Sequence, residues 1–271
     1  MIPESPNTGF VPKKSLGQNF LTSATVPEWL CAAAALTAGE TVYEIGPGTG
    51  RLTAVLLAKG AKVVAVETDK RAYQELQTTF AEELKGGQLK LILGDAKTLT
   101  PTDLGLLNQN YKVIANVPYY LSGFLLRQIL TNQNQPQTLV FLLQKELVER
   151  IARSRKESLL SLSVKCYGQP KYVKTVGRGH FTPQPKVSSA ILAVTNINRL
   201  AFSSVSEESF FQLLHLGFGQ KRKQLLGNLS QIYTRDQISS VLTSLNLPIT
   251  VRAEDLTLEN WLGLTAKLTS A

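Results

Sequence analysis

The chain has 271 residues, 43% of them hydrophobic, and a formal net charge of +9, which suffices for one large domain with a sizeable core and a smaller second domain. No apolar run reaches the length of a transmembrane helix and the first residues lack the apolar stretch of a signal peptide, so we expect no membrane association and a cytoplasmic location. The two cysteines, Cys31 and Cys166, stand in apolar contexts without a CxxC pattern or a nearby histidine, which argues against a disulfide framework and predicts no metal site.

The segment 41–59 predicts a strand, a glycine turn and a helix in succession. An apolar run leads into Gly46-Pro47-Gly48-Thr49-Gly50, and apolar residues then recur at helical spacing. A dinucleotide fingerprint needs its third glycine at position 51, but Arg51 stands there and the third glycine falls one residue early. The resulting G-x-G-x-G pattern suits S-adenosyl-L-methionine better than NAD. We therefore predict that Gly46 and Gly48 bind this cofactor.

Two further strands end in acidic residues. The strand at 62–67 ends at Glu67, which stands 21 residues after Gly46, where a carboxylate can accept hydrogen bonds from both ribose hydroxyls. The run 89–93 is followed by Asp95, which can accept a hydrogen bond from an adenine amine. Each acid alone could be a solvated charge at a strand end. Their shared position favours a cofactor site, because open parallel sheets bind ligands at the carboxyl ends of their strands.

The strand predicted at 111–115 is followed by Asn116-Val117-Pro118-Tyr119-Tyr120, which combines an amide, a proline and an aromatic ring. This set suits the exocyclic amine of an adenine, which is a poor nucleophile. The Asn116 oxygen and a backbone carbonyl of Val117 or Pro118 can accept its hydrogens while Tyr119 stacks on the base. The alternative is a strand-ending turn in which Pro118 blocks further pairing. We predict that Asn116, Pro118 and Tyr119 are catalytic residues.

The remaining elements complete an α/β pattern. Predicted strands alternate with predicted helices, which indicates a parallel sheet covered by helices on both faces. After a further helix near 157–165, two β-rich runs, 171–176 and 187–194, could pair antiparallel at the sheet edge. The strands are predicted at 41–45, 62–67, 89–93, 111–115 and 138–143, and the helices at 25–36, 51–59, 69–84, 121–131 and 144–154.

The polar segment 196–206 lacks strong periodicity and predicts a linker. Beyond it, apolar residues recur at helical spacing as far as Leu268, which predicts a small all-α domain. We therefore expect residues 1–200 to form a Rossmann-like α/β domain that binds the cofactor and carries catalysis. Residues 201–271 are expected to form a small helical domain.

Basic side chains concentrate in one part of the chain. Residues 145–199 contain 11 Lys or Arg residues and three Asp or Glu residues, whereas residues 201–271 contain six of each. A surface this basic attracts a phosphate backbone and makes binding depend on salt; the alternative is a generic solubilising surface. The predicted RNA contacts are Lys145, Arg150, Arg153 and Arg155, with a further contact or a solvated helical face at Lys221, Arg222 and Lys223.

Six segments together resemble one protein family, the small-subunit ribosomal RNA adenine dimethyltransferases. The resemblance covers nearly the whole chain, and its motifs are specific in combination. One departure lies at 156–163, which lacks the tyrosine-glycine pair expected before the Leu-Ser-Val run and leaves local loop contacts open. The segments are 13–21 (KKSLGQNFL), 44–53 (EIGPGTGRLT), 116–120 (NVPYY), 142–151 (LLQKELVERI), 181–192 (FTPQPKVSSAIL) and 218–229 (FGQKRKQLLGNL).

The resemblance implies that two adjacent adenosines near the 3′ end of small-subunit rRNA each receive two methyl groups from S-adenosyl-L-methionine. The implied partner is this rRNA within an assembling small ribosomal subunit, which the C-terminal domain would help to contact, and we expect a monomer. The implied cofactor-binding positions are Asn19, Leu21, Gly46, Glu67, Asp95 and Asn116.

Phe181 opens a stiff, proline-rich loop, because each proline fixes its own φ and restricts the residue before it. On the resemblance, we predict that Phe181 and Tyr119 sandwich a flipped adenine. The alternative is that Phe181 anchors the loop to the core.

Two other functions are compatible with parts of this sequence. One is methylation of a single adenine in large-subunit rRNA, which confers antibiotic resistance; the Gly17-Gln18 pair and the segments 218–229 and 252–254 favour the small subunit. The other is a catalytically silent RNA-binding assembly or transcription factor. Intact glycine, Glu67, Asp95 and Asn116 positions argue against it, because a pure binder need not hold both cofactor and amine.

Overall fold

The computed structural model describes residues 18–220 and 222–269, and its contacts divide the chain into two compact units. The first unit comprises residues up to Val148 together with Gln169–Ile197. The second comprises Glu149–Gly168 and Asn198 onward. Residues 149–168, which the sequence places with the first domain, thus group by contact with the C-terminal helices. The assignment of catalysis to residues 1–200 and of RNA contact to residues 201–271 stays a prediction.

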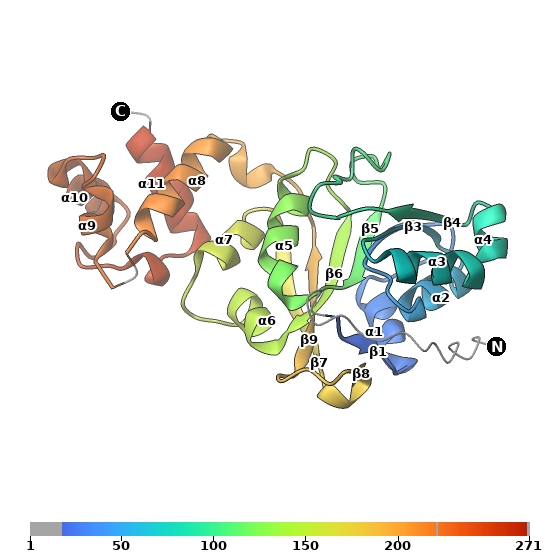
Figure 1. The fold of residues 1–271 in the computed structure, drawn as a ribbon. Helices are drawn as coiled ribbons and strands as arrows, with labels where there is room; N and C mark the ends of the chain where they lie inside the picture. The colour runs from blue at the N-terminus through green and yellow to red at the C-terminus, as the bar shows by residue number, and fades with distance from the viewer. Residues whose placement is uncertain (1–17, 221, 270–271) are drawn as a thin grey trace. The chain divides into compact units, whose positions relative to one another are not determined.

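A seven-stranded sheet organises the first unit (Figure 1), in the order β4-β3-β2-β5-β6-β9-β7. Its first five strands are parallel, and β9 runs antiparallel to both of its neighbours, β6 and β7. This confirms the predicted α/β sheet and its antiparallel edge pair. The strands are β2 (Thr41–Ile45), β3 (Lys62–Glu67), β4 (Leu89–Leu93), β5 (Lys112–Asn116), β6 (Thr138–Gln144), β7 (Gln169–Val176) and β9 (Ser189–Thr195).

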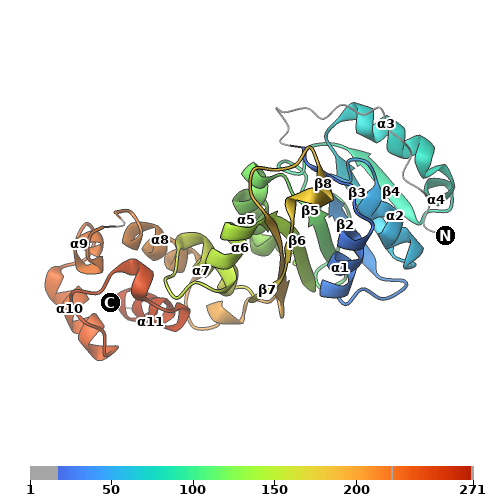
Figure 2. The same cartoon turned by 90° about the horizontal axis from the view of Figure 1, so that it is seen from below.

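The strand order places the two helical layers. From β2 the chain moves through α2 to β3 on one side, and from β5 it moves through α5 to β6 on the other. Right-handed crossovers in opposite directions put these helices on opposite faces of the sheet, as Figure 2 shows. The direction of the crossovers reverses between β2 and β5, so the connections that leave the carboxyl ends of these two strands run to opposite sides. The helices that begin or lie in this unit are α1 (Thr25–Ala33), α2 (Arg51–Ala58), α3 (Lys70–Thr79), α4 (Ala81–Lys85), α5 (Ser122–Thr131) and α6 (Lys145–Ala152).

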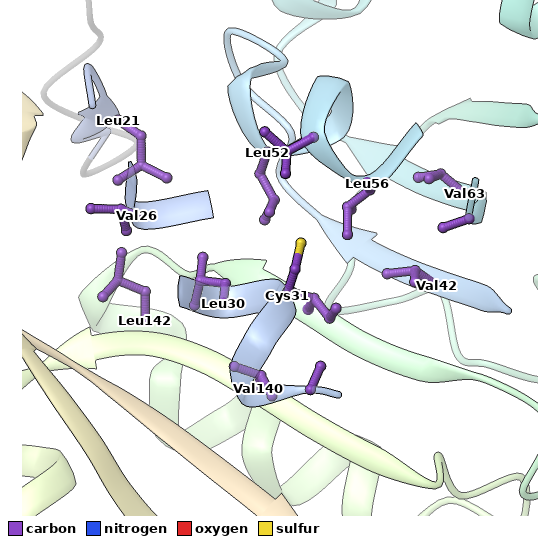
Figure 3. Close-up of a cluster of buried hydrophobic side chains, with 14 of the residues drawn as sticks. Leu21, Val26, Leu30, Cys31, Val42, Leu52, Leu56, Val63, Val140 and Leu142 are labelled. Carbon is purple, nitrogen blue, oxygen red and sulfur yellow. The ribbon is translucent and has the colours of Figure 1, made fainter. Parts of the chain in front are cut away.

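Apolar side chains from α1 and α2 pack on one face of this sheet around Cys31 (Figure 3). Leu30, Leu52 and Leu56 are fully or almost fully buried beside strand residues such as Val63. Burial raises the pKa of the Cys31 thiol to about 12, which keeps it protonated and unreactive near neutral pH. Cys31 is therefore a core residue, as its sequence context predicts.

The prediction of a single helix at 69–84 is wrong, because the helix is interrupted at Phe80. There φ and ψ are −112° and 35°, α3 ends and α4 begins. The buried Phe80 ring packs so close to Gly50 that a Cβ on Gly50 would lie 2.6 Å from it. Tertiary packing of one aromatic ring thus overrides the helical periodicity at this point.

The second unit is helical. Its core contains the fully buried Trp261 and Phe210, and Tyr167 lies against the Phe202 and Phe211 rings. The Tyr167 hydroxyl donates a hydrogen bond to Glu207, which also pairs with Arg199. These contacts place the segment around Tyr167 in this unit. Its helices include α7 (Leu159–Lys165), α8 (Glu207–Gly217), α9 (Leu225–Leu229), α10 (Arg235–Ser244) and α11 (Leu258–Thr269).

Candidate active site

A cavity opens at the carboxyl ends of β2 to β5, at the reversal of strand order where open α/β sheets bind ligands. It brings together residues from five separate segments of the sequence. Eight of the predicted site residues line it: Asn19, Gly46, Gly48, Glu67, Asp95, Asn116, Pro118 and Tyr119.

The glycine turn after β2 forms one wall of the cavity. Gly46 and Gly48 have φ of +64° and +58°, in the left-handed region that favours glycine. A Cβ on Gly46 would meet no protein atom within 4 Å, so a larger residue there would take space from the cavity. A Cβ on Gly48 would lie 2.9 Å from the Phe20 ring. The turn therefore lets a ligand approach the backbone closely, as S-adenosyl-L-methionine would require.

Glu67 is fixed at the end of β3 by two backbone donors. Its Oε2 accepts from the Gly48 amide at 2.9 Å, and its Oε1 accepts from the Asp69 amide at 2.8 Å. Burial raises the pKa of this carboxyl, although the backbone hydrogen bonds oppose the shift. The two carboxylate oxygens offer about four lone pairs, so acceptor capacity remains for a ligand hydroxyl. Glu67 thus joins the glycine turn to the next strand and still offers acceptors.

Asp95 and Gln18 extend the polar lining. Asp95 Oδ1 accepts from the Lys97 amide at 2.9 Å, and its other oxygen pairs with the Lys97 ammonium group. Gln18 Nε2 lies 3.4 Å from Asp69 Oδ2, which ties the N-terminal segment to the end of β3. The contact between Gln18 and Asp69 was not predicted, because the two residues lie in different segments and neither motif specifies their pairing.

The Asn116 side chain is oriented by the N-terminal segment. Its Nδ2 donates to the Asn19 carbonyl oxygen at 3.0 Å. Since a carbonyl oxygen can only accept, the carboxamide keeps its own Oδ1 available as an acceptor. The segment that carries Asn19 is held in turn by β1 (Phe20–Leu21), which pairs with β8 (Phe181–Thr182). A hydrogen-bond acceptor is therefore set at the end of β5.

Tyr119 is held by a second hydrogen bond. Its hydroxyl lies 2.8 Å from the buried Ser189 Oγ at the start of β9. The Pro118 carbonyl accepts from the Leu121 amide at 3.0 Å, which closes the short helical turn η2 (Tyr119–Leu121). The Tyr119 ring is thus fixed beside the cavity. The role of Ser189 could not be read from its position in the loop motif.

Two predicted residues lie outside this cavity. Leu21 is buried in the core and lines a smaller neighbouring cavity with Asn116 and the glycine turn. Phe181 is only 2% exposed, belongs to the same core cluster and lines neither cavity. This burial is what the loop-anchor alternative expects, and β8 pairs with β1 beside it. The stacking of Phe181 with Tyr119 on a flipped adenine stays a prediction.

Most of the predicted RNA contacts that the structure describes are exposed. Arg150, Arg153 and Arg155 are exposed, and Lys145 is half-buried at the start of α6. Arg222 and Lys223 are exposed before α9, and Lys221 lies outside the described residues, as do residues 13–17 of the N-terminal motif. Among residues 18–220 and 222–269, no helix is long and apolar enough to span a membrane, and no group of three metal-ligating side chains occurs.

Glu44 is a buried acid that the sequence did not single out. It lies in β2 beneath the glycine turn, lines the smaller cavity, and accepts a hydrogen bond from Thr53 Oγ1 at 2.8 Å. Burial raises the pKa of this carboxyl from 4.5 to about 8, and the nearby Glu67 adds to the rise. Glu44 is therefore largely neutral at pH 7.

We expect Glu44→Gln to be tolerated and to change how stability depends on pH. The raised pKa means that folded wild-type protein keeps a proton which the unfolded chain releases above pH 4.5. The contribution of the protonated Glu44 to the free energy of unfolding is complete below pH 4.5 and is lost as the pH rises to about 8. Urea unfolding at several pH values should show the variant gaining on wild type across this window, by on the order of a few kcal/mol. A constant difference would contradict a neutral Glu44.

Comparisons with known proteins identify the family. The model of the family described as ribosomal RNA adenine dimethylase matches residues 9–269. A protein of Dehalococcoides mccartyi named ribosomal RNA small subunit methyltransferase A is 38% identical over 253 residues, covering 92% of this chain and 86% of its own. A protein of the same name from Moorella thermoacetica is 33% identical, with 96% and 93% covered.

Solved structures share the fold. A dimethyladenosine transferase from Plasmodium falciparum superposes with a TM-score of 0.77 at 24% identity, covering 93% of this chain and 98% of its own. The 23S rRNA methyltransferase ErmE superposes with a TM-score of 0.73 at 21% identity, covering 93% and 100%. The family match spans nearly the whole chain, so this protein belongs to the ribosomal RNA adenine dimethylase family.

Proposed function

We propose that this enzyme transfers methyl groups from S-adenosyl-L-methionine to N6 of two adjacent adenosines near the 3′ end of small-subunit rRNA, within an assembling small subunit. The observation that carries the proposal is the Asn116 carboxamide. Its Nδ2 donates a hydrogen bond to the Asn19 carbonyl oxygen, so its Oδ1 is left to accept a hydrogen bond from the target amine. Relatives of 31% to 38% identity that bear the small-subunit name support the choice of rRNA.

The cavity residues fit the cofactor. Glu67 would accept from the ribose hydroxyls, Asp95 from the adenine amine, and the glycine turn would leave room at Gly46 for close backbone approach. Leu21 and Asn19 would bound the site from the N-terminal side. When bound, S-adenosyl-L-methionine supplies an electrophilic methyl group on a sulfonium leaving group.

The protein's own task is alignment. Asn116 Oδ1 and the carbonyl of Val117 or Pro118 would accept the two hydrogens of the target amine and direct its nitrogen in line with the methyl group. Tyr119, fixed by Ser189, would stack on the extruded base. After one methylation a single N–H remains, so one of these acceptors must suffice for the second transfer. The nitrogen carries a positive charge directly after the transfer, so its proton is acidic and leaves to water.

RNA contact is proposed for the basic segment. Arg150, Arg153 and Arg155 are exposed, as are Arg222 and Lys223, so they lie at the surface where a phosphate backbone can reach them. Residues 145–199 carry far more basic than acidic side chains. We further propose that the protein acts as a cytoplasmic monomer.

Affinity for small subunits should fall steeply with salt, because phosphate contacts release counterions. Neutralising Lys145, Arg150, Arg153 and Arg155 together should lower the slope of log affinity against log salt by roughly 3 if all four contact single-stranded RNA. A matched variant removes four exposed charges of the α/β unit and should leave the slope unchanged. These residues are Lys62, Lys70, Lys85 and Lys90. Equal slopes for both variants would make the segment a solvated surface.

The direct test of the function is methyl transfer from labelled cofactor to naked rRNA, small subunits and large subunits, followed by identification of the modified nucleoside. The proposal expects dimethyladenosine in small-subunit rRNA. Label in large subunits alone would support an activity of the kind named for ErmE, and binding without label would support a silent RNA-binding factor.

A further inference from the structure

Three side chains lead away from the cavity along one face of α5. Tyr120 lines the cavity from η2, which runs directly into α5, and Phe124 and Arg127 follow at spacings of four and three. Phe124 and Arg127 lie about 60° apart around the α5 axis, at about 100° per residue, and Tyr120 precedes Phe124 by about one turn. We call Tyr120, Phe124 and Arg127 the α5 strip.

Packing within the protein does not explain why the aromatic rings of Tyr120 and Phe124 are exposed. Tyr120 is 62% exposed and Phe124 is 49% exposed, whereas Leu125, Leu126 and Ile129 on the other side of α5 are buried. Within the described part of the chain, neither exposed ring stacks on another ring or has a side-chain hydrogen bond. Single exposed apolar residues are ordinary, but an exposed ring that lines the cavity, followed one turn later by a second exposed ring, indicates a binding surface.

The charge on α5 favours a nucleic-acid strand. The helix contains no acidic residue, and Arg127 is exposed without an ion pair among the described residues. A base offers a flat π-face to an aromatic ring, and its phosphate offers a negative charge to a guanidinium. The strip therefore matches the alternation of base and phosphate along one strand.

We propose that the α5 strip binds the nucleotide adjacent to the target adenosine in the RNA strand. The Tyr120 and Phe124 rings take the neighbouring base, and Arg127 takes its phosphate. This inference rests on the proposed function and adds the direction in which the strand leaves the cavity. In the proposed substrate the neighbouring base is the second adenosine.

The test replaces rings without removing apolar bulk. The double variant Tyr120→Leu/Phe124→Leu loses both π-faces, whereas Tyr120→Phe/Phe124→Tyr keeps them. The probe is a short single-stranded RNA with the target adenosine flanked on one side or the other by fluorescent 2-aminopurine, which stacking quenches. Tyr73→Leu on α3 is the aromatic control, and Lys62→Ala matches the charge lost in Arg127→Ala.

Wild type should quench the probe on one flank, and the ring-retaining variant should do the same. The double leucine variant should lose the quench, bind the RNA about tenfold more weakly, and raise the KM for small subunits. Arg127→Ala should weaken binding and Lys62→Ala should not. Calorimetric titration of the cofactor and thermal unfolding check that each variant is folded.

The inference is overturned if wild type quenches neither flank, if the leucine variant behaves as wild type, or if the ring-retaining variant loses as much as the leucine variant. The inference is also overturned if the double leucine variant loses binding to a ribosomal protein while its RNA affinity is unchanged. Failure of the proposed function looks different: ring-dependent quenching would persist while wild type made no dimethyladenosine on small subunits.

Discussion

Asn116→Ala should abolish methyl transfer while leaving small-subunit binding nearly intact. The substitution removes the acceptor that aligns the target amine, and loss of one such preorganised group costs roughly 100- to 1,000-fold in rate. It also removes the donor to the Asn19 carbonyl, so the loss should lie at or above the upper end of that range. Phosphate contacts supply most of the affinity for RNA, and they are untouched. Single-turnover rates at saturating cofactor and subunit measure the effect.

A matched control is available on the approach to the same strand. Asn110 is exposed two residues before β5, at the end of that strand away from Asn116. Asn110→Ala should keep both the rate and the binding of wild type. If Asn116→Ala also makes dimethyladenosine at nearly the wild-type rate, the alignment mechanism is wrong, whatever family the chain belongs to.

The sheet and most of its site were predictable because their signals are local. Each parallel strand is an apolar run that ends in a glycine, an acid or an amide, and the carboxyl ends of parallel strands share one edge. Gly46, Glu67, Asp95 and Asn116 therefore converge on one cavity although they are far apart in sequence. The antiparallel edge pair followed from β-rich runs on either side of a proline-rich segment.

The contacts that orient these residues were not predictable, because they join distant segments through single hydrogen bonds. Strand β1 has two residues and no periodicity, so nothing in the sequence specified its pairing with β8. That pairing accompanies the contact between Asn19 and Asn116 and the burial of Phe181 in the core. The stacking role of Phe181 stays a prediction. The interruption of the helix at Phe80 likewise accompanies packing of its ring against Gly50. A helical pattern in the sequence does not predict such a contact.

Glu67→Ala should weaken cofactor binding by about 100-fold or more. Two hydrogen bonds from ribose hydroxyls to a charged acceptor are lost, at roughly 1.5 to 3 kcal/mol each. The same carboxylate holds the Gly48 and Asp69 amides, so the variant also loosens the glycine turn. Calorimetric titration measures the total loss, with Glu82→Ala on α4 as the exposed glutamate control.

A double-mutant cycle separates the ribose contact from the loosened turn. Wild type and Glu67→Ala are each titrated with S-adenosyl-L-methionine and with an analogue that lacks one ribose hydroxyl. If Glu67 accepts from that hydroxyl, its removal should weaken binding to wild type but leave the affinity of Glu67→Ala unchanged, because the partner is already gone. Equal losses in both proteins would mean that Glu67 acts only by holding the turn, and the ribose contact would have to be assigned to another residue.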